Sequence, residues 1–465
     1  MNKQAVTAGV AMLLVAVAAV ATLTWNREME GEQRRQLQQI VAQHALQPLE
    51  RPPRQDPALV ALGKALFSEP ELSGNRDVSC ATCHDPALGT TDGLPLSIGT
   101  GGSGLGTLRQ PDPERRLVAR NAIALFNSGL PGWNSLFWDG RVERLPSGGY
   151  VTPAGRYLPP GLSNVLAAQG MFPVILRDEM RGGWYDVAGY AIQPGTTAEG
   201  GVNDAAPGGW HDIDIYGEPN ELAAIANGEQ HMPQIWSGLM ARLLAMPEYR
   251  RLFAAAYPGA PLGALGFEHA ANALAAFQTE AFTVVNSPWD RYVGGDLHAL
   301  SSDAVAGALL FYDEARCAAC HSGALFSDQA YHNIGAPQFG PGRDEDAPLD
   351  FGRWHVTGDE QDRFAFRTPP LRNVTITGPW LHNGAYDSLE AVISHHLDPE
   401  TALRAYDGTH LPPELRATLQ NEPVTIEAIL RTLDPLLQDE GRLSGEEIGE
   451  IVAFLEALEG GEIRD

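Results

Sequence analysis

The chain has 465 residues, of which 44% are hydrophobic, and its 32 Lys and Arg against 58 Asp and Glu give a formal net charge of −26. This length and hydrophobic content are enough for two or three domains with their own cores. The acidic balance argues against nucleic acid as a partner. At low salt it would favour basic protein partners, although solubility alone also accounts for it.

The N-terminus carries an uncharged, largely apolar run of nineteen residues from Ala5 to Leu23. This run is near the length that spans a bilayer and exceeds the apolar core of an ordinary secretory signal. We therefore expect residues 1–25 to anchor the chain in the inner membrane. Cleavage after Ala21, as in a signal peptide, is the alternative, and with either outcome the remainder is exported to the periplasm. Residues 26–55 are polar and Gln-rich, and we expect a helical or disordered stalk there.

The globular part is expected to begin near Asp56, because the apolar residues from Pro57 to Phe67 have helical spacing. This helix leads into Cys80-Ala81-Thr82-Cys83-His84, a C-x-x-C-H motif that recurs as Cys317-Ala318-Ala319-Cys320-His321. The paired thiols can add to the two vinyl groups of a haem, and the adjacent His then binds the iron.

The chain has four cysteines, and all four lie in these two motifs. We therefore expect two covalently bound haem c groups, with Cys80, Cys83, Cys317 and Cys320 as attachment points and His84 and His321 as iron ligands. Two redox dithiols or one four-Cys zinc site are the alternatives. The separation of the motifs places one haem in each of two domains, residues 56–290 and residues 291–465.

The remaining segments predict a mainly α fold with long loops and two cytochrome c-like haem domains. Gly- and Pro-rich sequence predicts loops over residues 99–113 and 182–219, the second as an insertion around residues 182–220. Helical patterns recur over residues 221–257, 267–285, 301–315 and 444–458. Ser444 and Glu447 have the spacing of a capping box at the start of the last of these.

A series of motifs along the chain carries a family resemblance. Between residues 57 and 460, apart from the loop after Gly182, the chain resembles the bacterial dihaem cytochrome c peroxidases and the MauG group. The residues that carry the resemblance, besides the two haem motifs, are Leu62-Gly63, Leu66-Phe67, Leu72-Ser73, Arg120-Asn121, Phe137-Trp138-Asp139-Gly140-Arg141, Ser322-Gly323, Phe366-Arg367, Pro370-Leu371-Arg372-Asn373-Val374, Pro379 and His382-Asn383-Gly384.

The resemblance implies that the N-terminal haem reacts with hydrogen peroxide, with a Gln and a Glu ten residues apart on its open side. Gln169 and Glu179 have this spacing. A carboxylate there can take a proton from bound peroxide and return it to the departing oxygen, so Glu179 is the expected general acid/base. Asp178 lies beside it in sequence, so a solvated surface acid is the alternative for Glu179, and a surface amide is the alternative for Gln169.

Two departures from the peroxidases of this family bear on the haem ligands. Thr100 stands where those peroxidases carry a blocking His, which leaves the first haem open, as in MauG, unless His211 or His231 binds it. The eight methionines all precede the second motif, so the Met that binds the second haem in the peroxidases is absent. His396 matches its position, with His395 as the alternative. A second His should leave this haem at lower potential than Met would.

The resemblance also implies a role for Trp138 and a calcium ion. Trp138 matches the indole between the two haems that carries charge in the family; a core Trp is the alternative. Asn121 and the backbone oxygens of Thr377 and Pro379 match the calcium ligands, and such oxygen donors suit calcium.

The predicted function is that of a dihaem peroxidase with charge sharing through a Trp, which oxidises a residue of a partner protein as MauG-like enzymes do. One alternative is a cytochrome c peroxidase that removes peroxide with electrons from small redox proteins. The other is an electron carrier without enzymatic activity.

Overall fold

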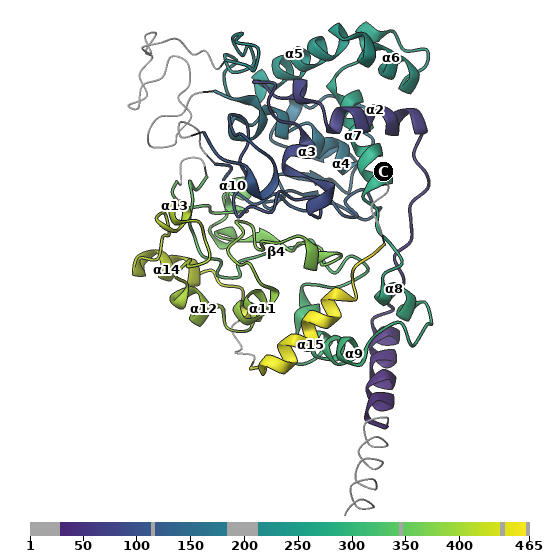
Figure 1. The fold of residues 1–465 in the computed structure, drawn as a ribbon, viewed down its shortest axis with the longest axis vertical. Coiled ribbons are helices and arrows are strands. Elements are labelled where there is room, and N and C mark those ends of the chain that lie inside the picture. Colours follow the sequence, from purple (N-terminus) through teal and green to yellow (C-terminus); the bar gives the residue numbers. More distant parts are fainter. Residues whose placement is uncertain (1–27, 113–116, 184–212, 344–346, 438–441, 462–465) are drawn as a thin grey trace, which may run out of the picture.

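The computed structural model describes residues 28–112, 117–183, 213–343, 347–437 and 442–461 (Figure 1). Within these ranges, no helix is both long enough and apolar enough to cross a membrane. The expected membrane segment, residues 1–25, lies outside the described residues, as does most of the loop that follows Gly182.

The fold is helix-rich, as expected. The helices of the first half are α2 (Pro57–Phe67), α3 (Cys80–Cys83), α4 (Val165–Gly170), α5 (Met232–Ala245), α6 (Pro247–Ala256) and α7 (Phe267–Ala281). Those of the second half are α8 (Pro288–Val293), α9 (Ser302–Tyr312), α10 (Trp354–Thr357), α11 (Leu389–Leu397), α12 (Pro399–Ala405), α13 (Pro413–Arg416), α14 (Pro423–Leu430) and α15 (Gly445–Glu456). The strands are β1 (Ser135–Leu136), β2 (Val142–Arg144) and β3 (Tyr150–Val151), which form one antiparallel sheet, and β4 (Tyr331–His332) and β5 (Phe366–Arg367), which form another.

The predicted helices agree with these bounds to different degrees. The helix before the first haem motif has the predicted bounds, with Asp56 capping the backbone N–H groups of Ala58 and Leu59. Ser444 and Glu447 form the predicted capping box of α15. The predicted helix over residues 221–257 is wrong in its first part, because residues 221–228 form turns and the helical pattern is divided between α5 and α6. Both helices begin with Pro near their N-termini, where its fixed φ suits a new helix.

The same packing of two helices occurs in both halves of the chain. The helix that precedes each haem motif packs against the last long helix of its half, α2 against α7 and α9 against α15. A glycine permits each close approach. A Cβ at Gly63 would lie 1.9 Å from the carbonyl oxygen of Ala273, and one at Gly307 would lie 1.8 Å from that of Glu450.

The chain forms two large hydrophobic cores, and each draws its buried residues from a different part of the sequence. One contains buried residues from Leu62 to Phe282, and the other contains Leu37, Leu46 and buried residues from Trp289 to Leu458. Figure 1 shows the two halves one above the other, with α2 and α5–α7 in the upper half and α8, α9 and α11–α15 in the lower half. A helix over residues 28–43 buries Leu37 in the lower core, so part of the expected stalk packs on the second half.

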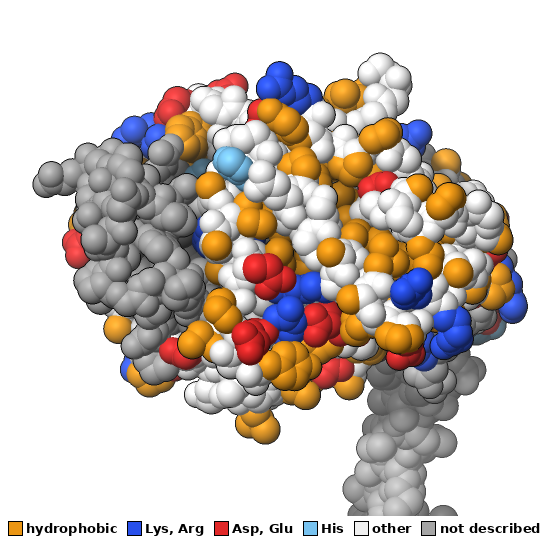
Figure 2. All heavy atoms as spheres, turned by 90° about the horizontal axis from the view of Figure 1, so that it is seen from above, with side chains coloured by type: hydrophobic (Ala, Val, Ile, Leu, Met, Phe, Trp, Pro, Cys, Tyr) orange, Lys and Arg blue, Asp and Glu red, His pale blue; other side chains and the backbone are white. Residues whose placement is uncertain are grey.

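The surface of the upper half mixes charge types. Figure 2 shows apolar side chains interspersed with both acidic and basic groups on this face. The acidic excess of the chain is therefore not gathered into one patch there.

Candidate functional site: two cavities joined by a tryptophan

Two cavities lie side by side, each built around one C-x-x-C-H motif. The first is lined by Cys80, Cys83 and His84, and the second by Cys317, Cys320 and His321. Within the described residues the four cysteines therefore do not gather into one zinc site. Both cavities have predominantly apolar walls. An apolar, concave site of this kind suits a large planar cofactor.

Each motif histidine is held in the orientation that a metal ligand needs. Nδ1 of His84 donates to the carbonyl oxygen of Thr90 at 3.0 Å, and Nδ1 of His321 donates to that of Phe326 at 3.0 Å. A carbonyl can only accept, so each Nδ1 carries the proton and each Nε2 is left as the ligand atom. Burial lowers the pKa of both rings, that of His321 to about 4, which keeps them neutral. The residues present therefore fit a haem at each motif.

Glu179 and Gln169 both line the first cavity, from neighbouring segments. Glu179 lies in a π-helical turn, Arg177–Arg181, and Gln169 in α4. The Glu179 side chain is 25% exposed, and its Oε1 lies 4.0 Å from Nη2 of Arg141. Burial raises the pKa of Glu179 to about 7, although Arg141 opposes the shift. A carboxyl group with this pKa can both accept and donate a proton near neutral pH.

Thr100 does not line the first cavity. Its hydroxyl donates to Oδ1 of Asp77 at 2.8 Å, and its backbone N–H donates to the carbonyl oxygen of Glu179 at 2.9 Å. Of the two histidines considered as substitute ligands, His211 lies outside the described residues, and His231 does not border the cavity. Among the described residues, His84 is the only histidine that lines this cavity, and Met180 is the only methionine.

His396 and His395 occupy opposite situations on α11. His396 lines the second cavity with His321, and its Nδ1 donates to the carbonyl oxygen of Val392 at 2.8 Å, so its Nε2 carries the lone pair. His395 is 0% exposed and uses both nitrogens elsewhere. Its Nε2 donates to the carbonyl oxygen of Ile334 at 2.8 Å, and its Nδ1 accepts from the Tyr386 hydroxyl at 2.9 Å. His395 does not border the cavity.

Trp138 lines both cavities. Its indole N–H donates to the backbone oxygen of Asn121 at 3.0 Å, which fixes the ring between them. Asn121 also borders both cavities, while Thr377 and Pro379 line the second. The three expected calcium ligands therefore lie around one cavity, next to Trp138.

Sequence reasoning missed a buried network of charges between the two halves of the chain. Asp139 is fully buried and forms ion pairs with Arg120 at 2.8 Å, Arg141 at 3.1 Å and Arg343 at 2.7 Å. Burial alone would raise the pKa of Asp139, but the three arginines hold it well below its usual range. Arg141 thus connects Asp139 to Glu179. The Trp-Asp-Gly-Arg sequence was the available signal, but it does not reveal which carboxylates and arginines meet.

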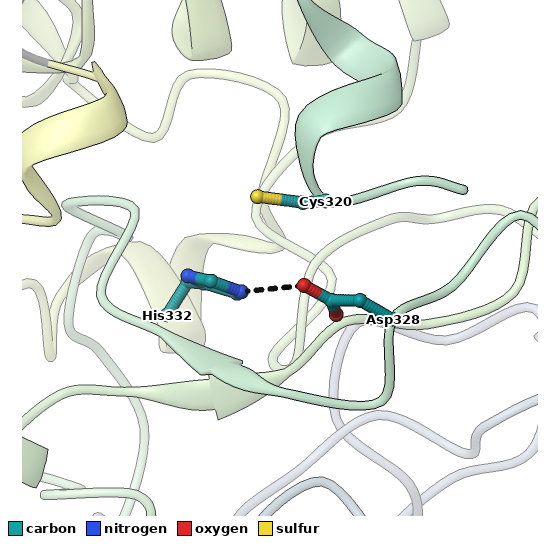
Figure 3. Close-up of side chains that lie close together, drawn as sticks. All are labelled: Cys320, Asp328 and His332. Atoms are coloured by element: carbon teal, nitrogen blue, oxygen red, sulfur yellow. Dashed lines mark hydrogen bonds and ion pairs between the residues drawn. The ribbon is translucent and has the colours of Figure 1, made fainter.

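A second missed group lies beside the second motif (Figure 3). His332 is held between Asp434 at 2.6 Å and Asp328 at 3.1 Å, with the sulfur of Cys320 close by. The pKa of His332 is raised, first by Cys320 and then by Asp434 and Asp328; with Cys320 in a thioether its contribution is lost, and the two carboxylates still favour the protonated ring. Because a Cys320 committed to a thioether would have no thiolate to offer a metal, we interpret this group as an ion pair that fastens β4 to the haem motif.

Comparisons with known proteins agree with this arrangement. The family described as "Di-haem cytochrome c peroxidase" matches residues 57–206 and 208–298. The chain is 32% identical over 345 residues to the methylamine utilization protein MauG of Methylorubrum extorquens, covering 73% of this chain and 69% of that protein. It is 26% identical over 414 residues to the cytochrome-c peroxidase IdrP1 of a Pseudomonas species, covering 83% and 84%. A solved MauG-like protein associated with microbial copper homeostasis has a similar fold, with a TM-score of 0.54, 24% identity and coverage of 89% and 93%.

Proposed function

We propose that this chain, which belongs to the di-haem cytochrome c peroxidase family, uses hydrogen peroxide in its first cavity and shares the oxidising charge with its second cavity through Trp138. Membership makes the protein an enzyme of the oxidoreductase class and implies two haem c cofactors. The observation that carries the finer proposal is that Trp138 lines both cavities, the first of which is also lined by Glu179 and the second by His321 and His396.

The residues that would hold the cofactors are Cys80, Cys83 and His84 in the first cavity, and Cys317, Cys320, His321 and His396 in the second. When bound, the haems supply the iron that binds peroxide and the electrons that cleavage of its O–O bond requires.

Glu179 would act on the peroxide itself. As a carboxylate it accepts the proton of the oxygen to be bound, and it then donates that proton to the departing oxygen, which leaves as water. Gln169 supplies an amide within the same cavity to orient the peroxide. Arg141, whose Nη2 lies 4.0 Å from Oε1 of Glu179, supports the charged form of this carboxylate.

The residue at position 100 bears on the choice between the two candidate targets of the oxidation. Thr100 occupies the position of the blocking His of the reductively activated peroxidases, and it bonds to Asp77 and does not border the first cavity. This supports the MauG-like alternative, in which a residue of a partner protein is oxidised. A cytochrome c peroxidase fed by small redox proteins is the second candidate, favoured by the likeness to IdrP1. Covalent haem attachment supports a periplasmic location, with residues 1–25 as an inner-membrane anchor or a cleaved signal.

The ferric spectrum of the purified protein tests this function. We expect a high-spin component from the first haem that changes when peroxide is added, together with a low-spin component from the second. Two low-spin haems that do not respond to peroxide, for example with Met180 bound to the first, would contradict the proposal.

The pH dependence of the peroxide reaction is a second test. Glu179 can accept a proton only when ionised, and its pKa is about 7. We therefore expect the rate to rise with pH up to about 7 and to level off above it. Stopped-flow measurements across this range should lose the step in Glu179→Gln. A step that persists in that variant would belong to another group.

Calcium is the third test. With Asn121, Thr377 and Pro379 as ligands, the ion would lie beside the residue that fixes the indole of Trp138. We expect a chelator to alter the spectra of both haems and weaken their coupling, and added calcium to restore both. Asn121→Ala should be insensitive to the chelator, because this variant lacks one of the calcium ligands. The Trp138 indole should keep its position, because it bonds to the backbone oxygen of residue 121, which the variant retains. If elemental analysis finds no calcium in the untreated protein, the calcium assignment is wrong.

A further inference from the structure

One buried arginine, Arg367 of β5, lines both cavities. Arg367 is 2% exposed. The other residues common to the two linings are uncharged: Asn121, Ile123, Ala124, Phe126, Trp138 and Pro370. The guanidinium of Arg367 is therefore the one charge that both linings share within the described residues.

Arg367 is fixed by contacts with the Trp138 segment. Its backbone N–H donates to the carbonyl oxygen of Trp138 at 2.7 Å, and its Nε donates to that of Phe137 at 3.0 Å. Its Nη1 lies 3.4 Å from the carbonyl oxygen of Thr368, and its Cζ lies 4.9 Å from the centre of the Trp133 ring. The guanidinium is thus held on the same backbone that positions the expected charge relay.

No carboxylate of the described residues forms an ion pair with Arg367. Two comparably buried arginines nearby do have such partners: Arg120 lies 2.6 Å from Asp350, and Arg372 lies 2.9 Å from Asp290. Burial lowers the pKa of Arg367 to about 10, which leaves it cationic at neutral pH. Backbone carbonyls, the Trp133 ring and the more distant charge of Asp139 stabilise this cation, but no carboxylate pairs with it directly, and a buried cation is costly unless an anion completes its environment.

Each haem carries two propionate carboxylates, and the forked guanidinium is suited to bind such groups. We propose that Arg367 is the cation that binds haem propionate at the boundary of the two cavities and that its single charge acts on both haems. The inference rests on the two-haem assignment of the proposed function. A positive charge near both irons favours their reduced states, so Arg367 raises both reduction potentials together and links their redox behaviour.

Spectroelectrochemistry of the full-length, haem-loaded protein tests this inference. Arg367→Gln should lower the midpoint potentials of both haems, shifting each reduction equilibrium by about tenfold, which is about 59 mV for a one-electron couple. The matched control is Arg353→Gln. Arg353 also lies between the halves, but it pairs with Glu143 at 3.0 Å and borders neither cavity. Removing its already neutralised charge should move the potentials much less.

Arg367→Lys keeps the charge without the fork. We expect potentials near those of the unchanged protein, with altered propionate bending bands in the resonance Raman spectrum. A Gln variant in which only one haem responds, or neither responds more than in Arg353→Gln, would overturn the shared role. If the Gln variant does not fold, the Lys variant provides the test. Lowered potentials of both haems, or unchanged propionate bands, in Arg367→Lys would then overturn the proposal.

These results are separable from the peroxide chemistry. The potentials and the propionate bands are measured without peroxide, so loss of the Arg367 effect leaves the Glu179 tests intact. Conversely, a protein with two haems but no peroxide reaction can still show the Arg367 effect. If the unchanged protein contains fewer than two haems per chain, both the proposed function and the role of Arg367 lose their premise.

Discussion

Glu179→Gln is expected to slow the reaction with hydrogen peroxide by about 10²–10⁴-fold while both haems stay attached. The amide has nearly the shape of the carboxyl group but can neither accept nor return the peroxide proton. Rapid-mixing absorbance measurements give the rate, and mass spectrometry of the intact chain gives the haem content. The separation of these two readouts matters, because Glu179 also contributes its backbone carbonyl to the Thr100 segment, which the substitution leaves unchanged.

Asp178→Asn is the comparison that identifies the acting carboxylate. It removes the same charge one residue away in the same π-helical turn. Because Asp178 helps to raise the pKa of Glu179, we expect a modest downward shift of the pH profile and a rate close to that of the unchanged protein at its plateau. If Asp178→Asn lost as much rate as Glu179→Gln, the general base would be Asp178 or the pair, and if neither lost rate, the turn would have no role in proton transfer.

His396→Ala is expected to convert the second haem from low-spin to high-spin, because it removes the ring that lines the second cavity together with His321 and is the proposed second iron ligand. Haem attachment should persist, since Cys317, Cys320 and His321 are unchanged. The magnetic circular dichroism and paramagnetic resonance spectra should lose the whole low-spin signal of one haem. Added imidazole should restore it by occupying the space left by the side chain.

His395→Gln is the matched control for this experiment. His395 is bonded to Tyr386 and Ile334, so the change is expected to lower the free energy of unfolding and to leave the low-spin signal in place. Thermal unfolding and the same spectra measure the two effects. Loss of the low-spin signal in His395→Gln, with its retention in His396→Ala, would exchange the roles of the two histidines.

Family register alone favoured His396 over its neighbour, and the structure adds a physical reason for the preference. Two adjacent residues of a helix point about 100° apart, and here His396 lines the second cavity while His395 does not. Which of them does so depends on how α11 lies against Tyr386 and the strand region near Ile334. Those contacts come from 9 and 61 residues away in the chain and leave no local pattern.

The capped helices α2 and α15 followed from local sequence, because a cap and an apolar stripe act within one or two turns. The segment before α5 did not follow from local sequence. Its apolar residues have helical spacing, but residues 221–228 form turns.

The two C-x-x-C-H motifs by themselves predict a haem in each half of the chain, because thioether formation and axial ligation by the motif His need five consecutive residues and nothing distant. Only the tertiary structure decided that Trp138 and Arg367 lie at the boundary of both cavities. It also decided that Arg367 is buried without a carboxylate partner among the described residues while Asp139 has three arginines. Charge pairing depends on which side chains meet across the two halves, and residues more than two hundred positions apart, such as Phe137 and Arg367, meet only when the halves are packed together.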